Sequence, residues 1–193
     1  MMSMAEIAGS IALGIGLAAA VGFRVFVPLL VASVGAYTGH LHLSESFAWL
    51  GTLPAVIMLG VAAAAEVAAY YIPGVDHLLD VIMTPTAFVA GALVSAAVIV
   101  DLPPLVKWVT AIIAGGGAAA FTQSITALLR VKSTATTAGL GNPVVASAEL
   151  GSSLVISLLA LIVPFLALAA VVVLVVFVFR RVRRALYRTR QHS

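Results

Sequence analysis

Long apolar runs, broken by short polar segments, make up most of this chain. Residues 158–179 contain no polar side chain, and residues 7–36 are interrupted only by Ser10, Arg24 and Ser33. About 20 apolar residues in a helix cross the hydrocarbon core of a bilayer, so these runs predict membrane-spanning helices. We expect spans over about residues 7–34, 50–72, 85–100, 105–129, 144–163 and 164–179.

Turn-forming residues separate most of these runs. Gly, Thr, His and Ser occur over residues 35–46, prolines mark breaks at 73–74 and 101–104, and a loop rich in Thr, Ser and Gly is predicted over 131–143. Only Pro164 divides the last two runs. Five full spans, with a short broken helix over 144–157, therefore remain the alternative to six.

These elements predict an all-α, polytopic transmembrane helical bundle of about six spans. Residues 14–20 (GIGLAAA) resemble residues 115–120 (GGGAAA), which suggests two inverted three-span halves with broken helices, a common plan of secondary transporters. The halves would cover residues 7–100 and 105–179. The alternative is that spans rich in Gly and Ala resemble each other by composition alone.

Small residues recur at every fourth position in three predicted helices. Such stripes let helix backbones approach closely within a membrane. We interpret them as packing surfaces, and a homodimer could use the same faces. The stripes are Gly14, Ala18 and Gly22; Gly60, Ala64 and Ala68; and Ala111, Gly115 and Ala119.

The composition agrees with a membrane location and excludes several kinds of chemistry. The 193 residues are 63% hydrophobic and 9% charged, against about 25% charged in soluble domains. There is no cysteine, which excludes disulfides, thiolate metal sites and cysteine nucleophiles. No phosphate-binding, dinucleotide or hydrolase motif occurs, so we expect neither an enzyme nor a cofactor; a lipid-modifying intramembrane enzyme is the least favoured interpretation.

The basic residues gather at the C-terminal end. Six of the ten lie in residues 180–193, directly after the last apolar run. Positive residues favour the cytoplasmic face, so we expect a cytoplasmic tail and, with six spans, a cytoplasmic N-terminus as well. Arg130 and Lys132 would then lie on the same side. Anionic lipid headgroups could bind this tail, whereas nucleic-acid binding is not expected.

Ionisable residues inside the apolar runs are the best clues to function. Arg24 lies well within the first run, where an arginine costs about 2.5–3.5 kcal/mol. It is either a counter-ion in the outer half of the bundle or a side chain that reaches the outer headgroups. Glu66 lies among alanine and valine residues, so it must take up a proton or find a partner. Glu149 is predicted at a similar depth.

Other polar residues are predicted near the same depth on the cytoplasmic side. Asp76 and Asp80 are one helical turn apart, and Gln123 and Asn142 lie at a similar level. Such an oxygen-rich group suits a hard cation or a proton. The alternative is that both aspartates are ordinary interfacial charges, with Arg130 or Lys132 as counter-charges.

Two further pairs carry little weight as sites. Continuous helices would separate Arg24 and Glu66 by about 15 Å in depth, so we expect no direct salt bridge between them. His40 and His42 form an H-x-H pair in a loop, without the further ligands that a metal site needs.

Three segments resemble a known family. These are residues 14–30, residues 66–80 (EVAAYYIPGVDHLLD) and residues 139–164 (GLGNPVVASAELGSSLVISLLALIVP). Together they are similar to small bacterial integral membrane proteins that share a domain of unknown function. The resemblance implies a bacterial inner-membrane location and transfers no catalytic residue.

We therefore expect a small inner-membrane transporter or channel-like protein. Glu66 and Glu149 would bind a cation or proton toward the cytoplasmic side, and Arg24 would balance charge in the outer half. The alternative is a non-catalytic assembly or scaffold protein that binds partner proteins or lipids.

Overall fold

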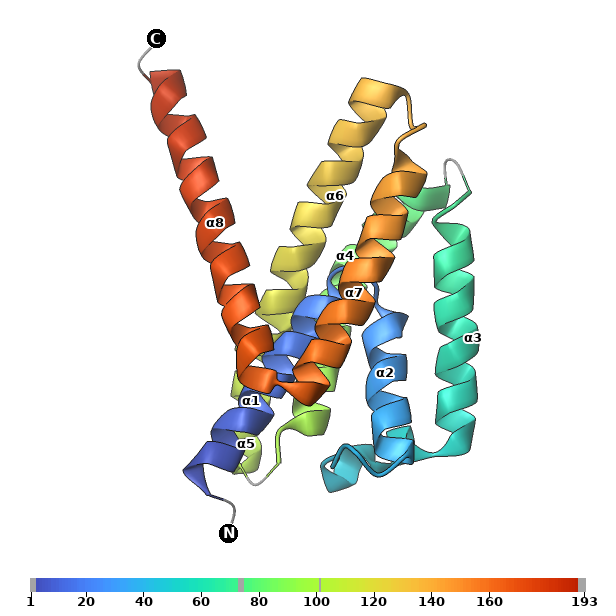
Figure 1. Cartoon of the computed structure of the whole chain (residues 1–193), viewed down its shortest axis with the longest axis vertical. Helices are drawn as coiled ribbons and strands as arrows, with labels where there is room; N and C mark the ends of the chain where they lie inside the picture. The colour runs from blue at the N-terminus through green and yellow to red at the C-terminus, as the bar shows by residue number, and fades with distance from the viewer. Residues whose placement is uncertain (1–2, 73–74, 101, 191–193) are drawn as a thin grey trace.

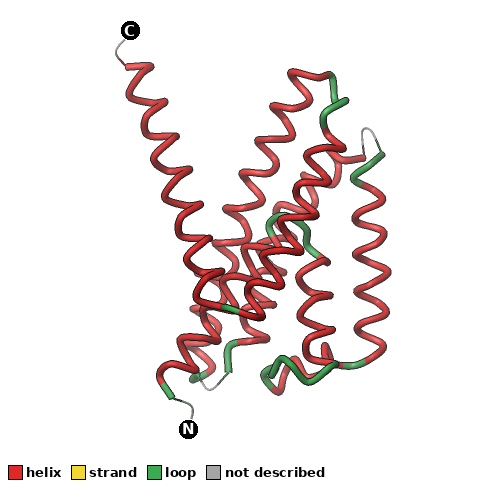
Figure 2. Tube along the Cα trace, in the orientation of Figure 1, coloured by secondary structure: helices red, strands yellow, loops and turns green. Residues whose placement is uncertain are grey.

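The protein is an all-α bundle of membrane-type helices. The computed structural model describes residues 3–72, 75–100 and 102–190, and all regular structure in these ranges is helical (Figure 2). Side chains of residues 76, 77, 182 and 185–190 lie outside this description. The predicted all-α polytopic bundle is confirmed.

The helices follow one another with short connections. In chain order they are α1 (Met4–Val21), α2 (Phe26–Tyr37), the 3-10 helix η1 (Glu45–Gly51), α3 (Leu53–Ala69), α4 (Val75–Val98), α5 (Pro104–Thr110), the π-helix η2 (Ala111–Gly116), α6 (Gly117–Thr137), α7 (Asn142–Ile162) and α8 (Pro164–Arg190).

Five stretches are long and apolar enough to cross a membrane. A sixth is obtained if η1 and α3, which meet at a bend of 70°, are taken as one broken span. The expectation of about six spans agrees with this range. The alternative with a broken helix over residues 144–157 does not, because α7 is continuous. The five stretches are Met4–Val21, Leu78–Val98, Pro104–Thr137, Asn142–Ile162 and Pro164–Arg181.

The first predicted span, residues 7–34, is two helices rather than one. In Figure 1, α1 rises into the bundle and α2 runs back down beside it. The turn between them is held by contacts from other helices. A Cβ atom on Gly22 would lie 2.8 Å from the backbone nitrogen of Gln123, and the Ser153 hydroxyl donates to the Ala20 carbonyl at 3.1 Å. The α1 helix therefore ends where it meets α6 and α7.

Two other predicted boundaries are wrong for a common reason. Helix α6 continues to Thr137, through most of the predicted loop 131–143, and α4 continues through Pro85, which was expected to begin a span. Threonine hydroxyls donate to carbonyls of the preceding turn in both helices, for example Thr137 to Ser133 and Thr84 to Asp80. Such bonds satisfy polar side chains within a helix.

Helix α1 is the centre of the bundle and contacts α2, α4, α6, α7 and α8. Two of the predicted small-residue stripes pack closely here. A Cβ atom on Gly14 would lie 3.2 Å from the Cα of Ser95 in α4, and one on Gly115 would lie 2.6 Å from the Ser95 Cβ. The third stripe does not pack in this way, because a Cβ atom on Gly60 would lie 4.0 Å from its nearest neighbour, Leu30 Cδ1.

The two ends of the chain lie at opposite ends of the bundle (Figure 1). The α1–α2 hairpin returns the chain to the level where it began, and α3, α4, α5–α6, α7 and α8 then alternate in direction. The expectation that both termini are cytoplasmic counted the first apolar run as one crossing, whereas this run forms a hairpin of two helices. The side of the membrane on which each terminus lies stays a prediction.

Candidate functional site

The turn between α1 and α2 brings Arg24 into the interior. Its side chain is fully buried, so it does not reach lipid headgroups. Its Nη2 donates to the Ala146 carbonyl at 3.0 Å and lies 3.4 Å from Glu149 Oε2. The expectation that Arg24 balances charge in a separate, outer half is therefore wrong, because the helix break places it beside α7.

Glu66 of α3 binds the start of α2 through two backbone N–H groups. Its Oε1 accepts a hydrogen bond from the Val25 backbone nitrogen at 2.8 Å, and its Oε2 accepts one from Phe26 at 3.0 Å. No side chain of α2 itself caps this end. A carboxylate at a helix N-terminus satisfies free N–H groups and interacts favourably with the helix dipole.

The predicted separation of Arg24 and Glu66 by about 15 Å assumed a continuous helix and is wrong for that reason. Both residues lie at the α1–α2 turn, since Glu66 bonds to Val25, the neighbour of Arg24. None of the ion pairs between described residues joins Arg24 to Glu66 directly.

Arg130 of α6 links two other helices through its guanidinium. Its Nη1 lies 2.5 Å from Asp80 Oδ1 in α4, and its Nη2 forms an ion pair with Glu149 Oε2 in α7. Arg130 is buried, whereas Lys132 is exposed. The sequence interpretation placed both at the cytoplasmic face and offered either one as a counter-charge, and Arg130 is the one that pairs with Asp80 and Glu149.

A helical periodicity could have revealed Arg130. The buried face of α6 consists of Ala119, Thr122, Gln123, Thr126 and Arg130, which recur at the spacing of three or four that marks one side of a helix. Arg130 therefore continues the face that carries Gln123.

Tyr70 at the end of α3 lies between the two arginines, and the sequence interpretation missed it. The Arg24 Cζ is 3.8 Å from the ring centroid and the Arg130 Cζ is 4.3 Å from it. Guanidinium groups over an aromatic ring gain cation–π attraction. The Tyr70 hydroxyl also donates to Asp80 Oδ1 at 3.5 Å. In the sequence, Tyr70 could have been recognised by its spacing, because it follows Glu66 by one helical turn and so lies on the same face of the helix.

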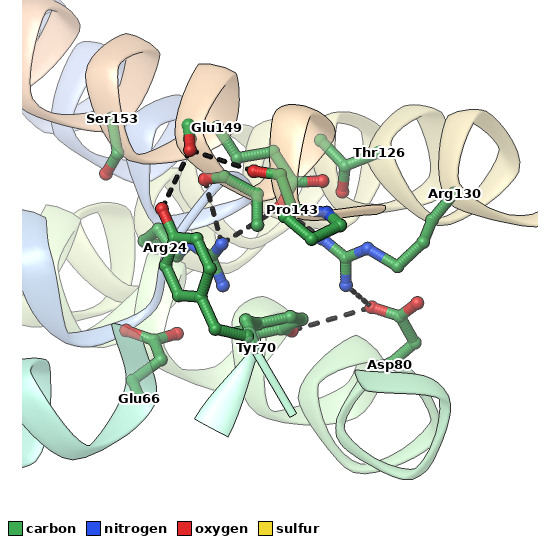
Figure 3. A network of polar contacts seen from close by, with 12 residues as sticks. Arg24, Glu66, Tyr70, Asp80, Thr126, Arg130, Pro143, Glu149 and Ser153 are labelled. Atoms are coloured by element: carbon green, nitrogen blue, oxygen red, sulfur yellow. Dashed lines mark hydrogen bonds and ion pairs between the residues drawn. The ribbon is translucent and has the colours of Figure 1, made fainter. Parts of the chain in front are cut away.

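These six side chains form one network, here called the charged cluster. Helices α3, α4, α6 and α7 and the α1–α2 turn all contribute to it, and Figure 3 shows them converging on Tyr70. Contacts between helices, rather than any local motif, bring these residues together. The charged cluster consists of Arg24, Glu66, Tyr70, Asp80, Arg130 and Glu149.

The other predicted site residues take different positions. Asn142 begins α7 and donates through Nδ2 to Thr134 Oγ1 at 3.0 Å. Gln123 is buried on α6, where the turn at Gly22 packs against its backbone. Its neutral side chain takes no part in the ion pairs of the charged cluster. The side chain of Asp76 lies outside the described residues. Asp80 is the most accessible member of the cluster, because 14% of its side chain is exposed.

The charged cluster retains buried polar atoms without partners. Its described side chains hold two guanidinium groups and three carboxylates, of which Glu66 pairs with the α2 N-terminus and not with an arginine. Four buried atoms have no hydrogen-bond partner within the described structure: Nε and Nη1 of Arg24, Nε of Arg130, and Oε1 of Glu149. Unpaired buried polar atoms are costly, and they are rare in folded proteins.

The described residues contain no group of three or more His, Asp or Glu side chains suited to a metal ion. His40 is exposed, and its Nδ1 lies 2.9 Å from Thr38 Oγ1.

Comparison with known proteins identifies the family. A search of curated proteins and a search of solved structures give no match. The sequence profile of one family matches residues 11–184, which include all the helices that form the charged cluster. The chain therefore belongs to the family described as Domain of unknown function (DUF4126).

Proposed function

We propose that the protein is a small inner-membrane transporter or channel-like protein whose charged cluster binds a cation or proton. The observation that carries this proposal is Arg24, which is buried at a helix break and paired with Glu149. Ionisable side chains inside a membrane protein are costly and commonly mark ion or substrate pathways.

The helix break supports the same proposal. Transporter sites are often built from discontinuous helices, whose N-termini and unwound segments face the bound ion or substrate. Here the N-terminus of α2 meets Glu66, and the unwound residue Arg24 meets Glu149. Such a break inside an apolar hairpin leaves backbone groups that must be satisfied by other helices.

The orientation follows from the C-terminal helix. Basic residues in the last part of α8 favour the cytoplasm, and this end of α8 points to the same end of the bundle as the turn between α6 and α7 (Figure 1). We place the charged cluster toward that cytoplasmic side, because Glu66 lies near the end of α3 that faces it. The N-terminus is then on the opposite face.

Replacing Glu66 and Glu149 together by glutamine should abolish flux through reconstituted protein. The change keeps side-chain size and removes two carboxylates from the cluster. Proteoliposomes with internal pH and cation indicators measure the flux, and thermal stability against pH and a panel of cations measures binding. Glu45→Gln, an exposed glutamate of η1, is the matched control. Flux retained at the parental rate in the double variant contradicts the assignment.

Helix α8 favours a second candidate function, a non-catalytic scaffold that binds lipids or partner proteins. Little of its apolar surface is buried against the bundle, and it stands apart from α6 in Figure 1. Its exposed arginines include Arg180, Arg181, Arg183 and Arg184.

Under this second candidate, changing these four arginines to glutamine should weaken binding of anionic phospholipid by about 1 kcal/mol for each arginine. Thermal stabilisation of the detergent-purified protein by added lipid measures the effect. The parent should be stabilised by anionic and not by zwitterionic phospholipid. Equal stabilisation of parent and variant argues against lipid binding at the tail.

A further inference from the structure

We infer that the ligand of the charged cluster is a proton, and that Glu149 carries it while Glu66 serves a structural role. This inference rests on the proposed function and assigns different tasks to its two glutamates. Two observations carry it: the partners of each carboxylate oxygen, and the position of the two guanidinium groups around Glu149.

The carboxylate oxygens differ in their partners. Both oxygens of Glu66 accept backbone N–H groups, from Val25 and Phe26. These donors are part of a helix end and keep their hydrogens at any pH. Glu149 directs only Oε2 at the two arginines, and its buried Oε1 has no partner among the described residues. Glu149 therefore has the free acceptor that a proton requires.

The cost of the unpartnered oxygen points to the same residue. Glu149 Oε1 is buried and accepts no hydrogen bond among the described residues, which is unfavourable for a charged carboxylate in a low-dielectric interior. A proton on Oε1 removes the charge of the carboxyl group, while Oε2 stays beside both guanidinium groups without moving either arginine.

The surroundings of Glu149 disfavour a metal cation. Arg24 faces it from the α1–α2 turn and Arg130 faces it from α6, so their N–H donors, which cannot ligate a metal, occupy the surroundings of Oε2. Hard cations also need about six oxygen ligands, whereas a proton needs one. From the other elements, Glu66 and Tyr70, at the end of α3, and Asp80 of α4 complete the titratable groups described in the cluster. Tyr37 of α2, Glu6 of α1 and the described arginines of α8 lie at the exposed ends of their helices.

Asp80 is the member of the cluster nearest to solvent. It is partly exposed and shares the Arg130 guanidinium with Glu149, so one side chain separates Glu149 from the exposed carboxylate. Uptake is reversible: a proton from water binds Oε1, and deprotonation returns it to water.

Infrared difference spectroscopy of the full chain in lipid nanodiscs, between about pH 8 and about pH 5, tests the inference. The parent should gain a carbonyl band of a buried carboxylic acid on acidification. Glu149→Gln should lose this band, and Glu149→Asp should shift its frequency. Glu66→Gln and the surface control Glu45→Gln should retain it. Glu149→Asp keeps the test decisive if the glutamine variant does not fold.

A band that persists unshifted in Glu149→Asp overturns the assignment. A carboxylate change that follows replacement of Na⁺ by a large organic cation at constant pH, and that Glu149→Gln removes, overturns the choice of a proton. The proposed function is tested separately by proton flux into proteoliposomes. The band without flux contradicts transport and supports the proton site, whereas flux that is unchanged in Glu149→Gln contradicts the role of Glu149 alone.

Discussion

Replacing Arg130 by glutamine should lower the free energy of unfolding by about 3–5 kcal/mol, the usual cost of removing one partner from a buried ion pair. Arg130 is buried and pairs with both Asp80 and Glu149. Without its guanidinium, two carboxylates remain close together, and Tyr70 loses one of its two cationic neighbours. Reversible unfolding in mixed detergent micelles measures the change.

Lys132→Gln is the matched control, since Lys132 lies two residues later on the same helix and is exposed. We expect a change within about 0.5 kcal/mol there. The double variant Arg130→Gln with Glu149→Gln should cost less than the sum of its single changes, because paired residues couple. Additive costs would show that the two side chains do not interact in the folded protein.

Gly115→Ala should be strongly destabilising although it adds a single methyl group. The new Cβ atom would lie 2.6 Å from the Ser95 Cβ and 2.8 Å from the Gly91 carbonyl oxygen, so η2 and α4 must move apart. Overpacking of this kind costs about 1–3 kcal/mol. Movement of Ser95 also endangers its hydrogen bond to the Gly14 carbonyl, at 2.8 Å, worth about 1 kcal/mol.

Gly117→Ala provides the opposite expectation two residues away. A Cβ atom on Gly117 meets nothing within 4 Å, and its backbone is helical. Alanine should therefore raise helix stability there by up to about 1 kcal/mol. The difference in thermal midpoint between the two variants is the measurement. A similar shift for both would show that η2 does not pack on α4 as closely as described.

The membrane helices could be predicted from the sequence because a helix that crosses a bilayer needs a long run of apolar residues. Apolar length alone indicates a span, and this was sufficient for α7 and for most of α6. The end of α1 could not be predicted in this way. Residues 21–26 (VGFRVF) are as apolar as their neighbours apart from Arg24, and the helix ends because Ser153 and Glu66, distant in sequence, bind its turn.

The candidate site could be predicted in part, for a similar reason. The cost of placing a charge in hydrocarbon singled out Arg24, Glu66 and Glu149 one by one. Their partners depend on which helices are neighbours. The depth of a residue in the membrane can be estimated from the sequence, but it does not show which helices lie side by side. Arg130 was therefore named only as one of two alternative counter-charges near the cytoplasmic face, and Tyr70, which has no charge, was marked only by its spacing from Glu66.

The α1–α2 turn also sets an order for biogenesis. Arg24 donates to Ala146, 122 residues later in the chain, and Val25 donates to Glu66, 41 residues later. A membrane protein is synthesised from its N-terminus, so the first hairpin leaves the ribosome with a charge and free N–H groups that have no partner yet. It can settle fully only after α7 has been made. We expect the insertion machinery to hold this hairpin in a polar environment meanwhile, and chains that stop after α6 to be removed by quality-control proteases.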